Sequence, residues 1–411
     1  MSTEAVSLTV GVPRESYPGE RRVALIPASI APLKKAGIGV VLESGAGLEA
    51  GHADDDYVAS GARIGSRTEV FASANVIFQV RAAGANRVSS RADLDSFRSG
   101  QWLIGLCDPF TEPSLMAELA GRDVSCFALE LLPRITRAQS MDVLSSMASI
   151  AGYKAVLMAA DQLPRLFPMM MTAAGTISPA KVFVMGVGVA GLQAIATARR
   201  LGAVVKAYDI RPAVKDEVLS LGAKFVELDL KTDNAAGAGG YAKAMDEEFY
   251  QRQRELLTQV VAESDVVITT AAVPGKKAPM LVTAEMVRRM PKRSLLIDMA
   301  AEQGGNCELT RPGETIVENG VSIVGCVNIP SSVPFHASQM YAKNLSTFLL
   351  SQVKGGQLAL NRADEIVSNT LVTHEGQVVH PRIREVLGLG SLEVAASADT
   401  GPSLPQNSSG A

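Results

Sequence analysis

Short apolar runs alternate with amphipathic stretches through the first third of the chain. Apolar runs of strand type occupy residues 8–12, 38–43, 76–80 and 102–106, and an amphipathic stretch over residues 27–36 ends at Gly37. Such runs, separated by helical patterns, are typical of strands and helices that follow one another in a parallel sheet. This part of the chain is therefore predicted to form a doubly wound α/β domain.

A second unit of the same kind begins with a long predicted helix over residues 141–160. The apolar runs after it predict strands at residues 181–185, 204–208, 224–228, 265–270, 294–298 and 321–324. A helix over residues 338–350 is expected to return to the first domain. The Ser-, Pro-, Gly- and Ala-rich residues near the C-terminus predict a disordered tail.

The predicted fold class is α/β, with two doubly wound Rossmann-like domains, parallel sheets, joining helices and a cleft between the domains. We expect residues 1–138 plus about 331–390 to form the N-terminal domain, since the late helix returns there. Residues 139–330 are expected to form the second domain, and residues 391–411 the tail.

Composition changes this picture little. The chain has 411 residues, enough for two domains, and its 47% hydrophobic and 20% charged content suits a well-buried fold. A net charge of −3 gives no reason to expect a nucleic-acid partner. The start of the chain does not resemble a signal peptide, and the apolar runs fall short of the roughly 18 residues of a spanning helix, so no direct membrane insertion is expected. The four cysteines lack metal-ligand spacing, which predicts buried reduced thiols and no metal site.

The sequence GVGVAG, from Gly186 to Gly191, follows the predicted strand KVFVM and precedes a predicted helix. Gly186 permits a tight turn, Gly188 lets the backbone approach a pyrophosphate, and Gly191 lets helix and strand pack closely. The helix N-terminus presents free N–H groups to the phosphates. A further predicted strand, VVKAYD, ends in Asp209, where the acid that binds the adenosine ribose is expected. This context predicts a dinucleotide-binding domain.

Asp209 also indicates which dinucleotide binds. A carboxylate accepts hydrogen bonds from both ribose hydroxyls and repels a 2′-phosphate, which favours NAD(H) over NADP(H). Arg211 argues the other way, because a nearby arginine can serve a 2′-phosphate, but the carboxylate holds the more important position.

Two later loops are expected to face the same crevice. One covers residues 269–279, with Pro274 and Gly275 where adenine is expected. The other covers residues 233–245, where a glycine-rich stretch and Tyr241 are suited to closing over the cofactor. By position alone, each is equally well a plain connecting loop.

The stretch RITRAQSMDVLSSMASIAGYKAV carries Gln139, Asp142 and Ser145 at intervals of three, after Arg134 in a loop. On a helix, this spacing places the three side chains on one face. Amide, carboxylate, hydroxyl and guanidinium groups together suit a ligand with donors and acceptors, such as a nicotinamide carboxamide. The same residues fit an N-terminal cap, in which Asp142 and Ser145 bond only local backbone.

That stretch, with GVPRE at Gly11, RVALIP at Arg22, GVGVAG, YDIRP, GGYAKAM and DMAAEQGG, resembles the NAD(H)-binding component of the proton-translocating NAD(P) transhydrogenase family. The resemblance covers residues 8 to about 350. The opening motifs and DMAAEQGG are shared with alanine dehydrogenase, a relative of similar fold. RAQSMDVLSSMASIAGYKAV and GGYAKAM are the parts that favour transhydrogenase.

The resemblance implies hydride transfer from NADH bound here to NADP⁺ on a partner, coupled to proton translocation. It implies that Arg134, Asp142 and Ser145 hold the nicotinamide end, while Gln139 reaches toward the partner's dinucleotide. Its other implied cofactor contacts are Val189 at the pyrophosphate turn, Asp209, Ile210 and Arg211 around the adenosine ribose, Ala272 at the adenine, and Gly240, Tyr241 and Gln253 in a mobile lid.

Hydride transfer between two nicotinamides requires no general acid or base, whereas alanine dehydrogenase requires both. Where that relative has a strand with paired lysines and a later histidine, this chain has Gln79, Arg81 and Cys107. The chain's histidines fall in no motif connected to the crevice and are expected at the surface; they are His52, His336, His374 and His380. Two rival functions share the dinucleotide site: an alanine dehydrogenase-like amino-acid oxidoreductase and a non-catalytic NAD(H)-sensing module.

The resemblance further implies a homodimer that works with NADP(H)-binding and membrane-spanning partner subunits. Some members of the family continue into membrane helices on the same chain, whereas this sequence ends in SADTGPSLPQNSSGA. We therefore expect a separately encoded cytoplasmic subunit that is peripheral to the inner (plasma) membrane through its partners.

Overall fold

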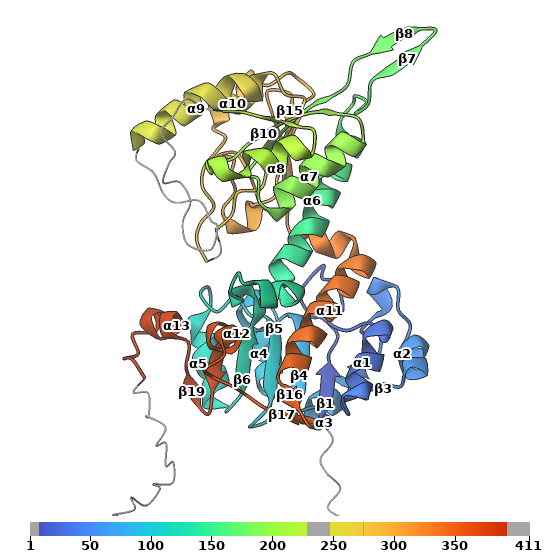
Figure 1. Cartoon of the computed structure of the whole chain (residues 1–411), viewed down its shortest axis with the longest axis vertical. Helices are drawn as coiled ribbons and strands as arrows, with labels where there is room; N and C mark the ends of the chain where they lie inside the picture. Colours follow the sequence, from blue (N-terminus) through green and yellow to red (C-terminus); the bar gives the residue numbers. More distant parts are fainter. Residues whose placement is uncertain (1–7, 228–246, 274, 393–411) are drawn as a thin grey trace, which may run out of the picture.

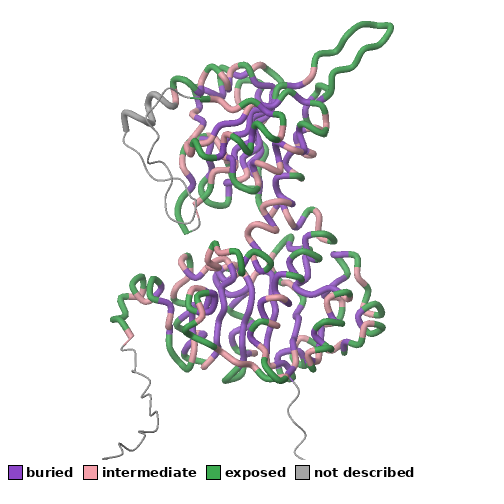
Figure 2. Tube along the Cα trace, in the orientation of Figure 1, coloured by how far each residue is buried: buried purple, intermediate pink, exposed green. Residues whose placement is uncertain are grey.

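The computed structural model describes residues 8–227, 247–273 and 275–392, although not the side chains of residues 247–253. These residues form two α/β lobes, each built around one large sheet (Figure 1). The first lobe combines elements from both ends of the described chain, and the second lobe uses the middle. Buried residues gather along the strands of both sheets (Figure 2), as expected for sheets covered on both faces.

The first lobe contains a sheet of eight strands in the order β19-β18-β6-β5-β4-β1-β2-β3. Strands β1 to β6 pair in parallel, and β18 and β19 add an antiparallel edge. The strands are β1 (Thr9–Val12), β2 (Gly39–Glu43), β3 (Arg63–Gly65), β4 (Val76–Arg81), β5 (Trp102–Leu106), β6 (Ser125–Ala128), β18 (Leu371–His374) and β19 (Gln377–Val378). The helices are α1 (Ile30–Lys35), α2 (Asp54–Ser60), α3 (Arg67–Ser73), α4 (Ser90–Leu94), α5 (Pro113–Gly121), α11 (Pro334–Ser351), α12 (Glu365–Thr370) and α13 (Pro381–Val386).

The second lobe contains a sheet of seven strands in the order β11-β10-β9-β12-β13-β15-β14. All neighbours pair in parallel except β14, which is an antiparallel edge strand. The strands are β9 (Lys181–Met185), β10 (Val204–Tyr208), β11 (Lys224–Phe225), β12 (Val266–Thr269), β13 (Leu295–Asp298), β14 (Thr315–Glu318) and β15 (Val321–Gly325). The helices are α7 (Val189–Arg200), α8 (Lys215–Ser220), α9 (Glu247–Ala262) and α10 (Ala284–Arg289).

Helix α6 (Val143–Gln162) belongs to both hydrophobic cores. Its first turns, with Val143 and Met147, pack into the core of the first lobe, whereas Ala155 and Ala159 pack into that of the second. It lies so close to α7 that a Cβ atom on Gly152 would come within 2.1 Å of the Ala190 carbonyl oxygen. Its length and composition would also suit a membrane-spanning helix, although the sequence pattern had indicated no run of that kind.

The structure confirms two mostly parallel α/β sheets and corrects details of the sequence prediction. Helix α6 begins at Val143 rather than at residue 141, because the Asp142 side chain caps it. The antiparallel edge strands β14, β18 and β19 were not predicted, nor was the exposed hairpin β7 (Met170–Thr172) and β8 (Gly175–Ile177), because short strands carry little periodic signal. The four cysteines are free and buried, as predicted.

We propose the domain boundaries 1–138 plus about 331–390 and 139–330, with sheet membership as support: the first sheet uses residues 9–128 and 371–378, and the second uses residues 181–325. The tail expected over residues 391–411 lies, from residue 393 on, outside the described residues.

Candidate functional site

The glycine turn joins β9 to α7 at the carboxyl edge of the second sheet. Gly186 has a φ of 96°, a conformation that favours glycine, and its N–H donates to the Tyr208 carbonyl oxygen. A Cβ atom on Gly191 would lie 2.0 Å from the Gly186 carbonyl oxygen, so only glycine lets the helix approach the turn this closely. A Cβ atom on Gly188 would meet nothing within 4 Å. Gly188 therefore borders open space at the start of α7, which suits the approach of a phosphate.

Two alanine substitutions are expected to separate these roles. Gly188→Ala should leave the melting temperature unchanged and weaken NADH binding about tenfold or more, because its methyl group occupies the space at the helix N-terminus. Gly191→Ala should lower the melting temperature as well, because its methyl group collides with backbone. Thermal unfolding and NADH titration measure the two effects, and unchanged NADH affinity in Gly188→Ala would refute this placement of the pyrophosphate.

Asp209 follows β10 and holds the turn from the side. Its Oδ2 accepts hydrogen bonds from the Val187 N–H at 2.7 Å and from the Arg211 guanidinium at 2.9 Å. Its Oδ1 accepts from the Arg211 backbone N–H and from Nε, both at 2.9 Å. Ile210 lies between them and is partly buried. The sequence prediction brought these residues together correctly, but it did not anticipate that Arg211 pairs with Asp209 itself.

The loop after β12 reaches the same turn. The Thr270 hydroxyl donates to the Gly186 carbonyl oxygen at 2.9 Å, and the Asn306 amide donates to the Ala271 carbonyl oxygen at 2.8 Å. Ala272 and Gly275 are exposed, and a Cβ atom on Gly275 would lie 3.4 Å from the Phe110 ring of the first lobe. The remaining predicted cofactor residues lie outside the described residues; they are Gly240, Tyr241, Pro274 and the Gln253 side chain.

The segment before α6 does not form the single helix face that the sequence spacing had suggested. Gln139 lies in a 3-10 helix, η5 (Thr136–Met141), and Asp142 has extended backbone between η5 and α6. Asp142 caps α6: its carboxylate accepts from the Ser145 N–H at 2.9 Å and from the Ser145 hydroxyl at 2.5 Å. The capping alternative is therefore realised, and it holds the Asp142 and Ser145 side chains together.

Gln139 and Arg134 are exposed, whereas Ala138 and Met141 of the same segment are buried in the first core. The Asn344 amide of α11 donates to the Ser140 carbonyl oxygen at 2.9 Å. The first lobe thus fixes the backbone of η5 and leaves the Gln139 side chain accessible.

Buried carboxylates at the ends of β4 and β5 were missed by the sequence analysis. The Glu15 carboxylate accepts from the Val80 and Arg81 N–H groups at 2.6 and 3.1 Å, and Glu130 accepts from the Cys107 N–H at 2.7 Å. Burial and the neighbouring Glu20 raise the pKa of Glu15 to about 8, against the lowering effect of its backbone hydrogen bonds. Burial likewise raises the pKa of Glu130 to about 7. The motif GVPRE contained Glu15, but nothing in the sequence indicated that its carboxyl group is enclosed.

The raised pKa of Glu15 predicts a pH-dependent contribution to stability. The folded state holds a proton that the unfolded chain releases near pH 4.5, so this contribution is full below that pH and is lost as the pH rises toward about 8. Glu15→Gln removes the titration. Melting temperatures measured between about pH 5.5 and about pH 8.5 should therefore fall less steeply for Glu15→Gln than for the unaltered chain. Glu118→Gln, at an exposed ion pair with Arg91, serves as control; identical slopes for all three proteins would contradict the assignment.

The groups that replace a proton-transfer apparatus are held in fixed contacts. Cys107 is completely buried, and its hydrogen bond with Cys126 together with burial raises the pKa of its thiol well above the ordinary value. Arg81 pairs with Glu302 at 3.1 Å and with Glu20 at 3.4 Å. Within the described ranges, no cluster of three or more His, Cys, Asp or Glu side chains has the geometry of a metal site.

The expectation that all four histidines lie at the surface is wrong for His380, which is 7% exposed and follows β19. Burial lowers its pKa and those of His52 and His374, so these rings favour the neutral form. His374 contacts the Ser125 hydroxyl at 2.8 Å, and His52 packs on Phe335 with ring centroids 5.0 Å apart. These contacts account for the rings as components of the first lobe.

Comparisons with known proteins agree with this geometry. The family description "Alanine dehydrogenase/PNT, N-terminal domain" matches residues 11–151, and "Alanine dehydrogenase/PNT, C-terminal domain" matches residues 155–381. The first segment of the divided "NAD(P) transhydrogenase subunit alpha" of Rhodospirillum rubrum is 46% identical over 92% of this chain and 99% of its own length. A solved transhydrogenase structure from Sinorhizobium meliloti has a TM-score of 0.80 at 46% identity and covers 90% of this chain and 100% of its own.

The alanine dehydrogenase of Mycobacterium tuberculosis is more distant, at 28% identity over 95% of this chain and 99% of its own length. The two matched domains together cover most of the chain, and the relatives at 46% identity carry the transhydrogenase name. The chain therefore belongs to the alanine dehydrogenase/PNT family, among the relatives of NAD(P) transhydrogenase alpha subunits.

Proposed function

We propose that this chain is the NAD(H)-binding subunit of a proton-translocating NAD(P) transhydrogenase. NADH bound in the second lobe transfers a hydride to NADP⁺ held by a partner subunit. The hydride leaves C4 of the dihydronicotinamide, which becomes NAD⁺, and adds to C4 of the partner's nicotinamide, which gives NADPH. No proton is taken up or released in this step, so the two rings need positioning at contact distance and exclusion of water, without a general acid or base.

One observation carries the proposal. The glycine turn and Asp209 form a dinucleotide-type site, while the groups at the facing edge of the first lobe are committed to each other. Arg81 lies between two carboxylates, and the Cys107 thiol is enclosed and protonated. This arrangement supports a reaction without side-chain proton transfer, as does the 46% identity to a transhydrogenase alpha subunit.

The residues have distinct proposed roles. Gly186, Gly188, Val189 and Gly191 hold the pyrophosphate at the start of α7; Asp209, Ile210 and Arg211 surround the adenosine ribose; and Ala272, Pro274 and Gly275 lie at the adenine. Arg134, Asp142 and Ser145 hold the nicotinamide, Gln139 reaches the partner's dinucleotide, and Gly240, Tyr241 and Gln253 form a lid. The active assembly is proposed to be a homodimer with NADP(H)-binding and membrane-spanning subunits, cytoplasmic and peripheral to the inner membrane.

The deciding experiment mixes the purified chain with an NADP(H)-binding transhydrogenase component and follows hydride exchange between NADH and an NADP⁺ analogue by absorbance. The mixture should catalyse exchange that neither protein catalyses alone. In parallel, the chain alone is given NADH, pyruvate and ammonia. Oxidation of NADH under those conditions would establish an amino-acid dehydrogenase instead, and NADH binding without exchange in the mixture would establish a sensing module.

A further inference from the structure

Two charged residues of the first lobe are buried together beside the second lobe. The Arg22 guanidinium donates to both oxygens of Glu20, at 2.7 and 2.6 Å, and the two side chains are 3% and 0% exposed. Although burial alone opposes it, Arg22 lowers the pKa of Glu20 to about 2, so the pair stays ionised. A buried ion pair of this kind requires further hydrogen bonds to its remaining donors and acceptors.

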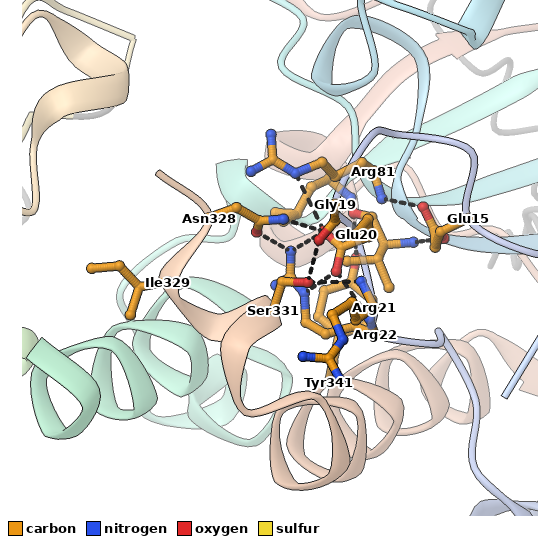
Figure 3. Close-up of polar contacts among 12 residues, drawn as sticks. Glu15, Gly19, Glu20, Arg21, Arg22, Arg81, Asn328, Ile329, Ser331 and Tyr341 are labelled. Carbon is orange, nitrogen blue, oxygen red and sulfur yellow. Dashed lines mark hydrogen bonds and ion pairs between the residues drawn. The ribbon is translucent and has the colours of Figure 1, made fainter. Parts of the chain in front are cut away.

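The second lobe supplies those hydrogen bonds through Asn328, which follows β15 (Figure 3). Its Oδ1 accepts from the Arg22 guanidinium at 3.0 Å, and its Nδ2 donates to Glu20 Oε2 at 3.0 Å. Asn328 has a φ of 45°, a left-handed conformation that costs energy in residues other than glycine. The amide therefore matches the ion pair in both polarity and position, and the chain adopts a strained backbone to place it there.

A second contact between the lobes lies beside the first. Arg81, at the end of β4, pairs with Glu20 at 3.4 Å and donates to Glu302 of the second lobe at 3.1 Å. Its guanidinium lies 4.3 Å from the centre of the Tyr17 ring, which restricts it further. The other oxygen of Glu302 accepts from the Asn328 N–H at 3.1 Å. Charges balance across the network, and its groups alternate between the two lobes.

We propose that these five residues, Glu20, Arg22, Arg81, Glu302 and Asn328, form an interlobe clasp that positions the two halves of the site. Glu302 and Asn328 follow β13 and β15, on the same carboxyl edge that carries the glycine turn after β9. Gln139 is fixed to the first lobe through η5 and α11. A change of angle at the clasp therefore moves the dinucleotide site relative to Gln139.

The clasp residues are positioning residues, and the consequence for hydride transfer rests on the function proposed above. Effective hydride transfer depends on approach distances, and a displacement of about 1 Å costs up to about 100-fold in rate. The dinucleotide contacts lie within the second lobe, so NADH affinity is independent of the clasp. Hydride transfer and NADH binding are thereby expected to respond differently to the same substitution.

The test measures the interlobe distance first, without reference to activity. Spin labels on Val88→Cys in the first lobe and Leu219→Cys in the second report this distance, because both positions are exposed and the native cysteines are buried. Labelled chain is mixed with excess unlabelled chain, so that only distances within one chain are detected. Glu302→Gln removes a clasp charge at a partly exposed position, and Asn328→Gly removes the amide while suiting the left-handed backbone. Both should broaden or shift the distance distribution.

Hydride transfer in the reconstituted complex should fall about tenfold in both variants, with NADH affinity unchanged. The double variant Arg81→Gln/Glu302→Gln should be no slower than the slower single variant, since both changes break one contact. Glu318→Gln is the matched control, because it breaks the 2.7 Å pair with Arg288 inside the second lobe and should alter neither distance nor rate.

Unchanged distances in Glu302→Gln and Asn328→Gly would overturn the clasp, and so would altered distances with an unchanged transfer rate. Loss of NADH affinity with unchanged distances would assign these residues to ligand contact instead. Absence of transfer in the unaltered complex would refute the proposed function, while the distance measurement would still decide whether the clasp exists.

Discussion

Gln139→Asn is expected to reduce hydride transfer in the reconstituted complex by about 100-fold while NADH affinity is retained. The substitution shortens an exposed side chain by one methylene and leaves its amide intact. The buried neighbours Ala138 and Met141, with the hydrogen bond from Asn344 to Ser140, keep the backbone of η5 in place. The loss is therefore one of reach toward the partner's dinucleotide, with no loss of folding.

Single-turnover exchange and NADH titration measure the two quantities. Gln377→Asn, an equivalent change at an exposed position of β19, should alter neither. Equal losses of affinity and transfer in Gln139→Asn would place this side chain in NADH binding and favour a sensing module.

Asp209→Ala is expected to weaken NADH by about 10- to 100-fold and to reduce discrimination against NADPH, because hydrogen bonds to a charged group contribute about 1.5–3 kcal/mol. All four acceptor positions of the carboxylate are in use, two with backbone N–H groups and two with the Arg211 guanidinium. Ribose hydroxyls must therefore displace the guanidinium contacts when they bind. Without Asp209, the Arg211 charge becomes available to a 2′-phosphate.

Affinities for NADH and NADPH, each measured by titration, give the preference. Asp209→Asn separates charge from hydrogen bonding, since it retains one oxygen near the Val187 N–H, and it should shift the preference less than alanine does. Asp216→Ala, at an exposed position on α8, should leave the preference unchanged. If Asp209→Ala retains the original preference, the ribose does not bind at this position.

The sequence determined the elements whose signal is local. The strand KVFVM, the turn from Gly186 to Gly191 and the strand ending in Asp209 occupy the predicted residues, because apolar periodicity and glycine geometry act over a few residues. The gathering of Asp209, Ile210 and Arg211 at the turn was predictable for the same reason. The expected identity of the cofactor followed from the sign of one charge.

Only the tertiary structure decided which side chains pair across long separations. Asp142 became a helix cap, Arg211 turned onto Asp209, and Glu15 was enclosed beside β4 because other elements removed it from water. The contact of Glu20 and Arg22 with Asn328 joins residues more than three hundred positions apart, which no local pattern encodes. Burial and charge pairing depend on the packing of whole lobes, so the setting of the interlobe clasp emerged only once both sheets were in place.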